Sequence, residues 1–221
     1  MKSKMKERVL MSILMLSLFS LLGLLAGCGT QVSTTKEGKS DFFPHSDGYS
    51  WNYLSGGTIE YDATVEGFST EETYSFNGTT ELSGGIVVQN YITPSTSEPS
   101  YYLINDTGTY YFGTASHPTT EGELDLSFPF YIGKKWQGLG GITAEVVSYE
   151  TVTTPMGDFQ AYKVSFSFPG DFVASDWYAS SVGRVKRYAN IIIPALVSLE
   201  GEMRVVAVTF EETASLESKN F

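Results

Sequence analysis

Cys28 carries the only thiol of the 221-residue chain, and its setting favours covalent modification. It directly follows Leu25, Ala26 and Gly27, and the two small residues leave room for a peptidase to cut before it. A thiol in this position can take a diacylglycerol through a thioether, and the amine freed by cleavage can be acylated as well. The spacing is that of a lipobox and predicts lipidation of Cys28.

The residues before Cys28 have the three parts of an export signal. Four basic side chains open the chain, residues 9–25 are apolar or small without a charge, and small residues end the run. We therefore expect a signal peptide over residues 1–27. The alternative is a permanent transmembrane helix, but the run lies at the short end of the spanning range, and such a helix needs no cysteine.

Acylation of Cys28 predicts a cell-envelope protein held by its lipid on the extracytoplasmic side, at about 0.8 kcal/mol per buried CH₂. Gly29 and Thr30 follow the cysteine, whereas an aspartate there is the usual retention signal in bacteria with two membranes. The anchor would lie in the outer membrane of such a bacterium, or on the outer face of the cell membrane where there is only one. The sequence leaves both locations open.

Residues 28–41 form the next segment, which is polar and almost free of apolar side chains. This composition predicts a lipidated flexible tether with an r.m.s. span of roughly 20 Å. Ser33 and Lys36 match the S-x-x-K pattern of serine acyl-enzymes, but that pattern needs a packed helix and partner motifs that the sequence lacks. Beyond the tether, residues 42–221 suffice for a single domain with its own core.

The exported part of the chain is strongly acidic. The leader holds four of the 14 basic side chains and one of the 25 acidic ones, which leaves a net charge near −14. Such a surface repels nucleic acid and anionic lipid head groups. Arg184, Lys186 and Arg187 are the exception, and they either face an anionic partner or alternate along an ordinary exposed strand.

The other candidates for chemistry have simpler structural explanations. His45 and His117 lie beside prolines, without a carboxylate or second histidine at metal-ligand spacing, so we expect surface positions for both. Glu121, Glu123 and Asp125 alternate on one strand face, where they form either a calcium site or, as we favour, a solvated face. We therefore expect no enzymatic activity, no cofactor and no metal site.

Apolar and polar residues alternate over much of the domain, the pattern of strands with one buried face. Such runs occupy residues 58–66, 123–128, 162–168 and 206–210, and turn sequences occur at residues 77–78, 105–108, 138–141 and 155–158. Residues 191–199 could form one or two helical turns, and no longer helix is expected. The sequence predicts an all-β domain of about ten to twelve strands, built as a strongly curved antiparallel sheet or open barrel.

One motif occurs twice, 85 residues apart. Phe43–Trp51 and Phe128–Trp136 share the pattern F-P-x-x-x-G-x-x-W. The proline fixes φ, the glycine permits a tight turn, and the tryptophan can insert as a strand begins. We interpret the two copies as similar structural turns, and we expect Trp51 and Trp136 to be largely buried.

Four segments occur in the same order in a group of bacterial lipoproteins: the first F-P-x-x-x-G-x-x-W turn, FPFYIGKKW, ETVTTPMGDFQAYKVSF and DWYASSVGRVKR. The chain resembles this group, whose shared domain has no known function, over most of residues 42–221. The resemblance implies a long curved antiparallel sheet similar to the half-barrels of periplasmic lipoprotein carriers. It brings no catalytic residues with it.

Aromatic residues make up 14% of the chain and are the last feature that bears on function. They can be ordinary core and cross-strand residues, or they can line a concave sheet that binds an acyl chain or stacks on a glycan. The leading hypothesis is a non-enzymatic lipoprotein that binds a hydrophobic ligand, at residues that the sequence does not identify. The alternative is a structural lipoprotein that docks another envelope protein.

The replacement Cys28→Ser should abolish membrane retention and leave the domain folded, because residues 29–41 offer almost nothing to a core. Radiolabelled palmitate should mark the wild type and not the variant, with fractionation read after a high-salt wash. Retention of the variant in the washed membrane would show instead that residues 9–25 form a permanent transmembrane helix.

Overall fold

The structure is a computed structural model that describes residues 40–221 except 63, 95, 97, 168–171 and 200–201. The expected signal peptide, Cys28 and the tether as far as residue 39 lie outside the described residues. In the part that is described, no helix is long and apolar enough to cross a membrane.

Twelve strands form one antiparallel sheet, and two short 3-10 helices, η1 (Ser40–Phe42) and η2 (Leu139–Gly141), are the helical elements of the described residues. The strands are β1 (Ser50–Tyr61), β2 (Thr64–Leu82), β3 (Ile86–Ile92), β4 (Ser100–Asn105), β5 (Gly108–Thr114), β6 (Pro118–Ser127), β7 (Lys135–Gln137), β8 (Thr143–Thr154), β9 (Gly157–Ser167), β10 (Phe172–Ala179), β11 (Gly183–Leu199) and β12 (Glu202–Asn220). The predicted all-β class and the curved antiparallel sheet are confirmed.

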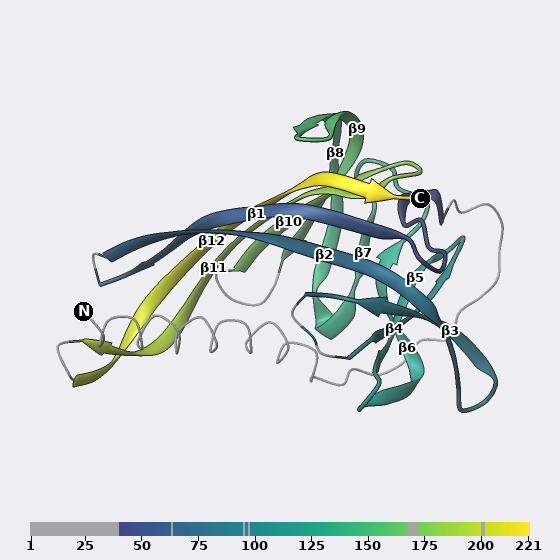
Figure 1. Cartoon of the computed structure of the whole chain (residues 1–221), viewed down its shortest axis with the longest axis horizontal. Coiled ribbons are helices and arrows are strands. Elements are labelled where there is room, and N and C mark those ends of the chain that lie inside the picture. Colours follow the sequence, from purple (N-terminus) through teal and green to yellow (C-terminus); the bar gives the residue numbers. More distant parts are fainter. Residues whose placement is uncertain (1–39, 63, 95, 97, 168–171, 200–201) are drawn as a thin grey trace.

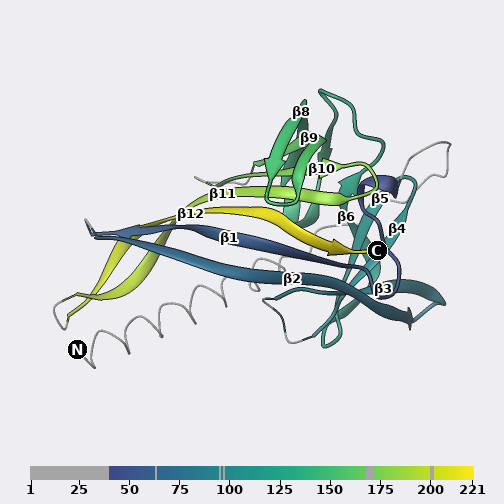
Figure 2. The ribbon, with the colours of Figure 1, turned by 45° about the horizontal axis from the view of Figure 1, so that its top comes forward.

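The strand order makes the sheet a nearly closed barrel. Each strand pairs with its neighbours in sequence, except that β6 and β7 do not pair with each other, and the first strand, β1, also pairs with the last, β12, from Ser50↔Asn220 to Tyr61↔Val208. The edges of the sheet are therefore β6 and β7, which follow one another in the chain. Figures 1 and 2 show the sheet curling from the β2–β3 side round to β8 and β9.

A seam without a backbone ladder separates β6 from β7. Across it, the indole N–H of Trp136 donates to the carbonyl oxygen of Asp125 (2.9 Å). The backbone N–H of Gly140 in η2 donates to a carboxylate oxygen of Glu123 (3.3 Å). Side chains and one short helix thus close the barrel where strand pairing stops.

The repeated turns precede β1 and β7, the first strands of two six-stranded halves. Gly48 and Gly133 hold the same place in the motif and have φ of +84° and +88°, where a side chain would be strained. The N–H of Gly48 donates to the carbonyl of Phe76 (3.0 Å), and the N–H of Gly133 donates to that of Val146 (2.8 Å). The interpretation as two similar structural turns is confirmed.

The two tryptophans of the motif are buried, as expected, with 4% of Trp51 and 8% of Trp136 exposed. Both indole N–H groups donate to a backbone carbonyl, Trp51 to Val182 (2.6 Å) and Trp136 to Asp125. Each ring therefore fills core volume and also joins its own strand to a second segment, which is distant in sequence for Trp51 and 11 residues away for Trp136.

One end of the barrel is plugged by the segment that leads into β1. The ring of Phe43 contacts those of Phe76 and Tyr91 (centroids 6.0 and 5.9 Å), and Phe42 contacts Phe130 (5.1 Å). The N–H of Ser181 donates to the carbonyl of Asp41 (2.7 Å), so Asp41, which the sequence assigned to the tether, bonds to the barrel.

From the other end the hairpins β1–β2 and β11–β12 project beyond the rest of the sheet, to the left in Figure 1. These four long strands curve together, and Gly57 permits their closest approach. A Cβ at Gly57 would overlap the carbonyl oxygen of Glu211 on β12. Only glycine fits where two backbones come this close.

Three local predictions are wrong. Residues 58–66 are not one strand but the tip of the β1–β2 hairpin. The turn breaks the alternation, because Val65 pairs with Glu60 on the face opposite to Ile59 and is 62% exposed. Asn77 and Gly78 form a bulge inside β2 rather than a hairpin turn, because Asp47 accepts from the N–H of Gly78 (2.7 Å). Residues 191–199 belong to β11, where β12 supplies their backbone partners, and form no helical turn. The other predicted turns, at 105–108, 138–141 and 155–158, are confirmed.

The variants Trp51→Ala and Trp136→Ala should each lower the free energy of unfolding by about 3–5 kcal/mol, because each deletes a large buried ring and a hydrogen bond. Chemical denaturation measures the loss, with Tyr131→Ala as the control since that ring is 57% exposed. Losses no larger than that of Tyr131→Ala would mean that neither tryptophan supports the core.

Candidate functional site

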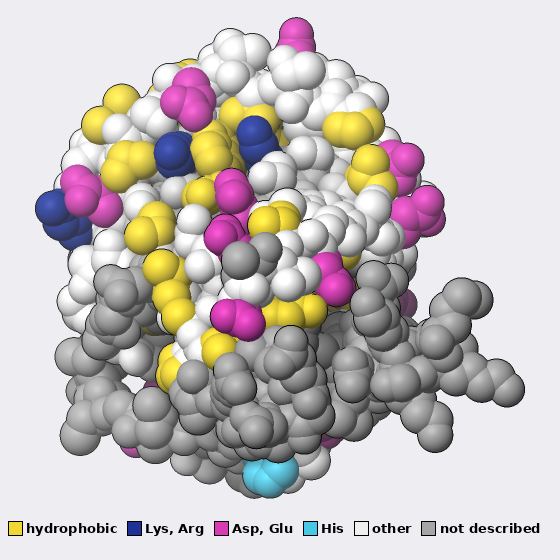
Figure 3. Space-filling model, turned by 90° about the vertical axis from the view of Figure 1, so that its left-hand side faces the viewer, with side chains coloured by type: hydrophobic (Ala, Val, Ile, Leu, Met, Phe, Trp, Pro, Cys, Tyr) yellow, Lys and Arg dark blue, Asp and Glu magenta, His cyan; other side chains and the backbone are white. Residues whose placement is uncertain are grey.

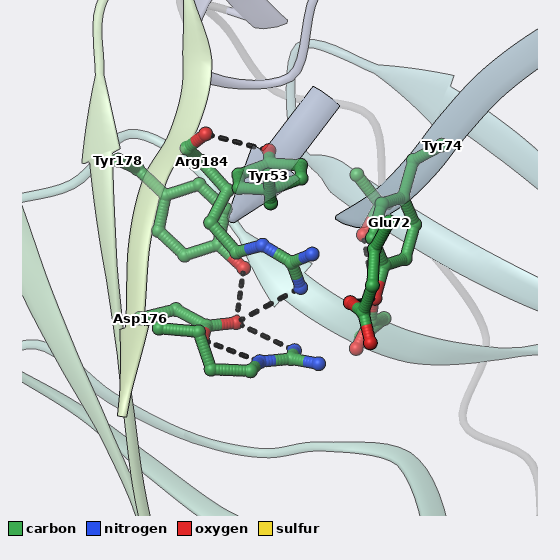
Figure 4. A network of polar contacts seen from close by, with 9 residues as sticks. Tyr53, Glu72, Tyr74, Asp176, Tyr178 and Arg184 are labelled. Atoms are coloured by element: carbon green, nitrogen blue, oxygen red, sulfur yellow. Dashed lines mark hydrogen bonds and ion pairs between the residues drawn. The ribbon is translucent and has the colours of Figure 1, made fainter. Parts of the chain in front are cut away.

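A polar cluster inside the barrel is the candidate site. It consists of Asp176 and Tyr178 on β10, Arg184 and Arg187 on β11, and Tyr53 on β1, and we call it the lumen cluster (Figure 4). Asp176 and Tyr53 are 2% and 3% exposed, whereas the side chain of Arg187 is 32% exposed, so the centre of the cluster is buried and one side of it meets solvent. Buried charge of this kind requires partners or a ligand.

A bulge brings both arginines to the same face of the sheet. Residues 184 and 187 are three apart and would point to opposite faces of a regular strand. The register between β10 and β11 shifts after Trp177, so that Asp176 pairs with Arg187 and Tyr178 pairs with Arg184. The extra residue in β11 reverses the alternation, and both guanidinium groups lie in the lumen.

Asp176 is the centre of the cluster. Arg187 binds it through two parallel hydrogen bonds, Nε to Oδ1 and Nη2 to Oδ2, both 2.9 Å long. The hydroxyl of Tyr178 donates to Oδ2 (3.1 Å), and Nη1 of Arg184 is 3.8 Å from the same oxygen. Burial alone would raise the pKa of Asp176, but the two arginines and these hydrogen bonds hold it below its ordinary value.

Arg184 has a different environment. Its guanidinium carbon is 4.9 Å from the ring centre of Tyr53 and 4.8 Å from that of Tyr74, so the cation contacts two aromatic rings that are perpendicular to each other. Its side chain is 10% exposed. Among the described residues its Nε is a buried donor without a hydrogen-bond partner.

The tyrosines of the cluster remain protonated over the physiological range. Burial raises the pKa of Tyr53 to about 12, although the nearby Arg184 guanidinium opposes the shift. The hydroxyl of Tyr53 donates to the backbone carbonyl of Arg184 (2.7 Å), and that of Tyr74 donates to Glu72 (3.0 Å). These phenols act as hydrogen-bond donors and ring surfaces rather than as bases.

Asp125 on β6 is an acidic neighbour of the cluster. Burial raises its pKa to about 6, and the carboxylate of Asp176 adds to the increase. The hydroxyl of Thr109 donates to it (3.3 Å). Ionised Asp125 is thus less favourable in the fold than in water.

A hollow of about 30 Å³ adjoins the cluster near the plugged end of the barrel. It is lined by Arg184, Gly183 and five aromatic rings, those of Phe43, Trp51, Tyr53, Tyr91 and Tyr178. Its volume suits a group about the size of one water molecule.

The comparisons with known proteins give a resemblance of fold and no family. No protein-family model and no curated protein matches the chain. A predicted exported protein with a YmcC-like fold from Bacteroides fragilis is 14% identical, with a TM-score of 0.33, and the alignment covers 81% of this chain and 99% of that one. A predicted lipoprotein from Parabacteroides distasonis is 13% identical, with a TM-score of 0.33 and coverage of 81% and 98%. Neither similarity is strong enough to bear on function.

The basic residues predicted as one cluster divide between the two faces of the sheet. Arg184 and Arg187 lie in the lumen, whereas Lys186 lies over the ring of Trp177 (5.3 Å) on the opposite face, with Lys163 also over that ring (4.9 Å). The indole N–H of Trp177 donates to a carboxylate oxygen of Glu150 (2.7 Å). The alternative of an ordinary exposed strand is wrong for the two arginines, because the bulge turns them inward. The alternative of an anionic partner stays a prediction.

His117 lies beside a serine and a carboxylate, an arrangement that must be tested against a catalytic triad. Ser116 Oγ is 2.8 Å from His117 Nδ1 and donates to Glu98 (2.7 Å). In a triad the histidine bridges the serine and the acid, whereas here the serine is the bridge and its proton is directed to Glu98. Ser116 and His117 are exposed in the β5–β6 turn, which this contact stabilises.

The remaining predicted sites are structural. His45 Nδ1 hydrogen-bonds the carbonyl of Phe43 (2.9 Å). Glu121 is exposed, while Glu123 and Asp125 have separate partners across the seam and on β5. Within the described ranges no three acidic, histidine or cysteine side chains are grouped to hold a metal ion. Cys28, Ser33 and Lys36 lie outside those ranges.

The variant Asp125→Asn should be more stable than the wild type at pH 7, by about 1–3 kcal/mol. Between the ordinary pKa of 3.8 and the folded value of about 6, the folded wild type binds more protons than the unfolded chain, so its stability decreases as pH rises through this window. The variant has no carboxylate to ionise at this position and so does not lose this stability. The difference in stability between the variant and the wild type should therefore vanish below pH 4.

Urea denaturation at pH 4, 5.5 and 7 measures the effect, with Asp106→Asn in the exposed β4–β5 turn as the chemically matched control. Equal pH profiles for the wild type and Asp125→Asn would contradict the raised pKa.

Proposed function

We propose that the chain is a non-enzymatic, lipid-anchored protein of a bacterial cell envelope whose barrel binds a hydrophobic ligand. The lipobox at Cys28 supports the anchor. The observation that carries the binding role is the interior, where aromatic rings surround a buried cationic cluster and a small hollow. Ligand sites combine such apolar walls with a few polar groups that fix orientation.

The aromatic wall is continuous across several strands. Rings of Phe43, Tyr91, Tyr102 and Tyr111 follow one another with centroids 5.9, 5.7 and 5.5 Å apart. Toward the projecting hairpins, Phe68 on β2 and Phe210 on β12 stack at 5.3 Å. The inner face therefore offers apolar contact on both sides of the lumen cluster.

Viewed from the end where the hairpins project, the described surface shows apolar side chains among acidic ones, and few basic ones (Figure 3). An acidic exterior disfavours adsorption to anionic lipid head groups and nucleic acid. The acyl chains on Cys28 would then be the attachment to the membrane. The lipid would lie in the outer membrane of a bacterium with two membranes, or on the outer face of a single cell membrane.

The non-enzymatic role is supported by the chemistry of the cluster. Its charged members are two arginines and a carboxylate whose pKa is lowered, and its phenols have raised pKa values. None of these groups is a nucleophile or a base near neutral pH. Such a set suits recognition of a ligand rather than turnover.

A second function, docking of another envelope protein, is favoured by the open edge of β2. Strand β3 pairs with β2 only from Ser75 onward, so residues 67–74 have a sheet neighbour on one side among the described strands. A sheet edge of this length can accept a strand from a partner.

Native mass spectrometry of the full chain, released from detergent micelles, distinguishes the two functions. We expect an added mass of a few hundred daltons, lost on collisional activation, if the barrel carries a small ligand. A stoichiometric protein subunit and no small ligand would support docking instead, and a catalytic turnover assigned to the chain would contradict both.

A further inference from the structure

We propose that Arg184 and Arg187 form the binding site for the anionic head group of an amphiphile, whose tail lies along the concave face of β1, β2 and β12. This inference deepens the proposed function and rests on it. The shared chemistry is a terminal anion, a carboxylate or a phosphate, on a single alkyl chain.

The charges of the lumen cluster do not balance within hydrogen-bond distance. Two guanidinium groups face one carboxylate, that of Asp176. Arg187 alone satisfies Asp176 through its paired hydrogen bonds, and Tyr178 adds a third. The other nearby carboxylates have neutral donors: Tyr74 bonds Glu72, Thr109 bonds Asp125, and Ser55 bonds the buried Glu212 on β12. Arg184 is therefore the surplus cation.

The unpartnered Nε of Arg184 is the observation that points to a ligand. Almost every buried donor in a folded protein has a partner, so an orphaned one in a side chain that is only 10% exposed requires an explanation. The rings of Tyr53 and Tyr74, which are perpendicular to each other, both contact the guanidinium of Arg184 and provide no hydrogen-bond acceptor for its Nε. These contacts hold the group in place and leave Nε for an acceptor.

The hollow beside Arg184 fits an oxygen of a head group and not a chain. Its volume is about 30 Å³, and its walls apart from Arg184 are mostly aromatic. A single water could bond the Nε but would not balance the charge. An anionic oxygen does both, through charge-assisted hydrogen bonds.

Arg187 faces the route by which the tail would leave the cluster. Its side chain is 32% exposed, and its bonds to Asp176 use Nε and Nη2, which leaves Nη1 for a second ligand oxygen. Beyond it on β12, toward the projecting hairpins, Glu212 comes first and accepts a hydrogen bond from Ser55. The stacked rings of Phe68 and Phe210 follow. A head group between the arginines places an alkyl tail past Glu212 and onto these rings.

Photoaffinity labelling of the full chain in membranes tests the site. The probe is palmitate with a diazirine in its chain, and peptide mass spectrometry locates the adducts. The competitors are palmitate, hexadecyl phosphate and hexadecanol. We expect adducts on β1, β2 or β12, displaced by one or both anions at concentrations about tenfold lower than by hexadecanol, since a charged hydrogen bond is worth at least one decade of affinity.

A set of variants distinguishes the loss of the Arg184 charge from a general effect of substitution on the fold. Arg184→Gln should weaken labelling about tenfold. Arg184→Lys keeps the charge but loses the planar set of N–H donors, so its labelling should be intermediate between that of Arg184→Gln and that of the wild type. Lys186→Gln removes the same charge from the opposite face of the same strand and should label like the wild type. If Arg184→Gln fails to fold, the competition on the wild type still decides the question.

The relative strengths of the competitors identify the head group or overturn the site. Stronger displacement by palmitate identifies a carboxylate head group, and stronger displacement by hexadecyl phosphate identifies a phosphate. Equal displacement by hexadecanol, with Arg184→Gln labelled like the wild type, would overturn the head-group site and leave hydrophobic binding intact. Labelling no greater than in membranes without the protein would overturn both proposals.

Discussion

The pairing of the first strand with the last determines the rest of this fold. Without the β1–β12 ladder the chain would be two separate six-stranded meanders, each beginning with the same turn and a buried tryptophan. The ladder joins them into one sheet and forces the curvature, since the edges β6 and β7 are already linked by the chain. Every group in the lumen, from Tyr53 on β1 to Asp176 on β10, is positioned through this junction.

The lumen cluster shows how one register irregularity sets the electrostatics of an interior. The register shift after Trp177 places Arg184 and Arg187 on one face of the sheet. Asp176 lies on the same face of the neighbouring strand, where it pairs with Arg187. Burial would raise the pKa of this carboxylate, but the paired arginines lower it. Asp125, without such a partner, has its pKa raised to about 6. The same barrel thus contains two buried acids with opposite shifts, and the difference is the presence of a cation in contact.

Periodicity and turn chemistry predicted much of this architecture, because strand alternation and buried aromatic residues depend on local sequence. The burial of Trp51 and Trp136 followed from a motif that carries its own geometry. The wrong predictions concern positions whose conformation depends on residues that are distant in the sequence. Asn77 and Gly78 form a bulge because Asp47 accepts from Gly78, and the inward turn of Arg184 depends on the register between β10 and β11. No local pattern encodes either, so the sequence identified the two arginines as unusual but not their place inside the barrel beside Asp176 and Tyr53.

The resistance of the barrel to opening differs around its circumference. Parting any two paired strands breaks a row of backbone hydrogen bonds at once, whereas parting β6 from β7 breaks side-chain contacts, chiefly that of Trp136 with the carbonyl of Asp125. The seam is therefore the mechanically weakest part of the barrel wall. It lies beside Asp125, the acid whose pKa is raised. The barrel can widen most easily at the seam, because β6 and β7 can move apart there while every backbone ladder of the sheet stays intact.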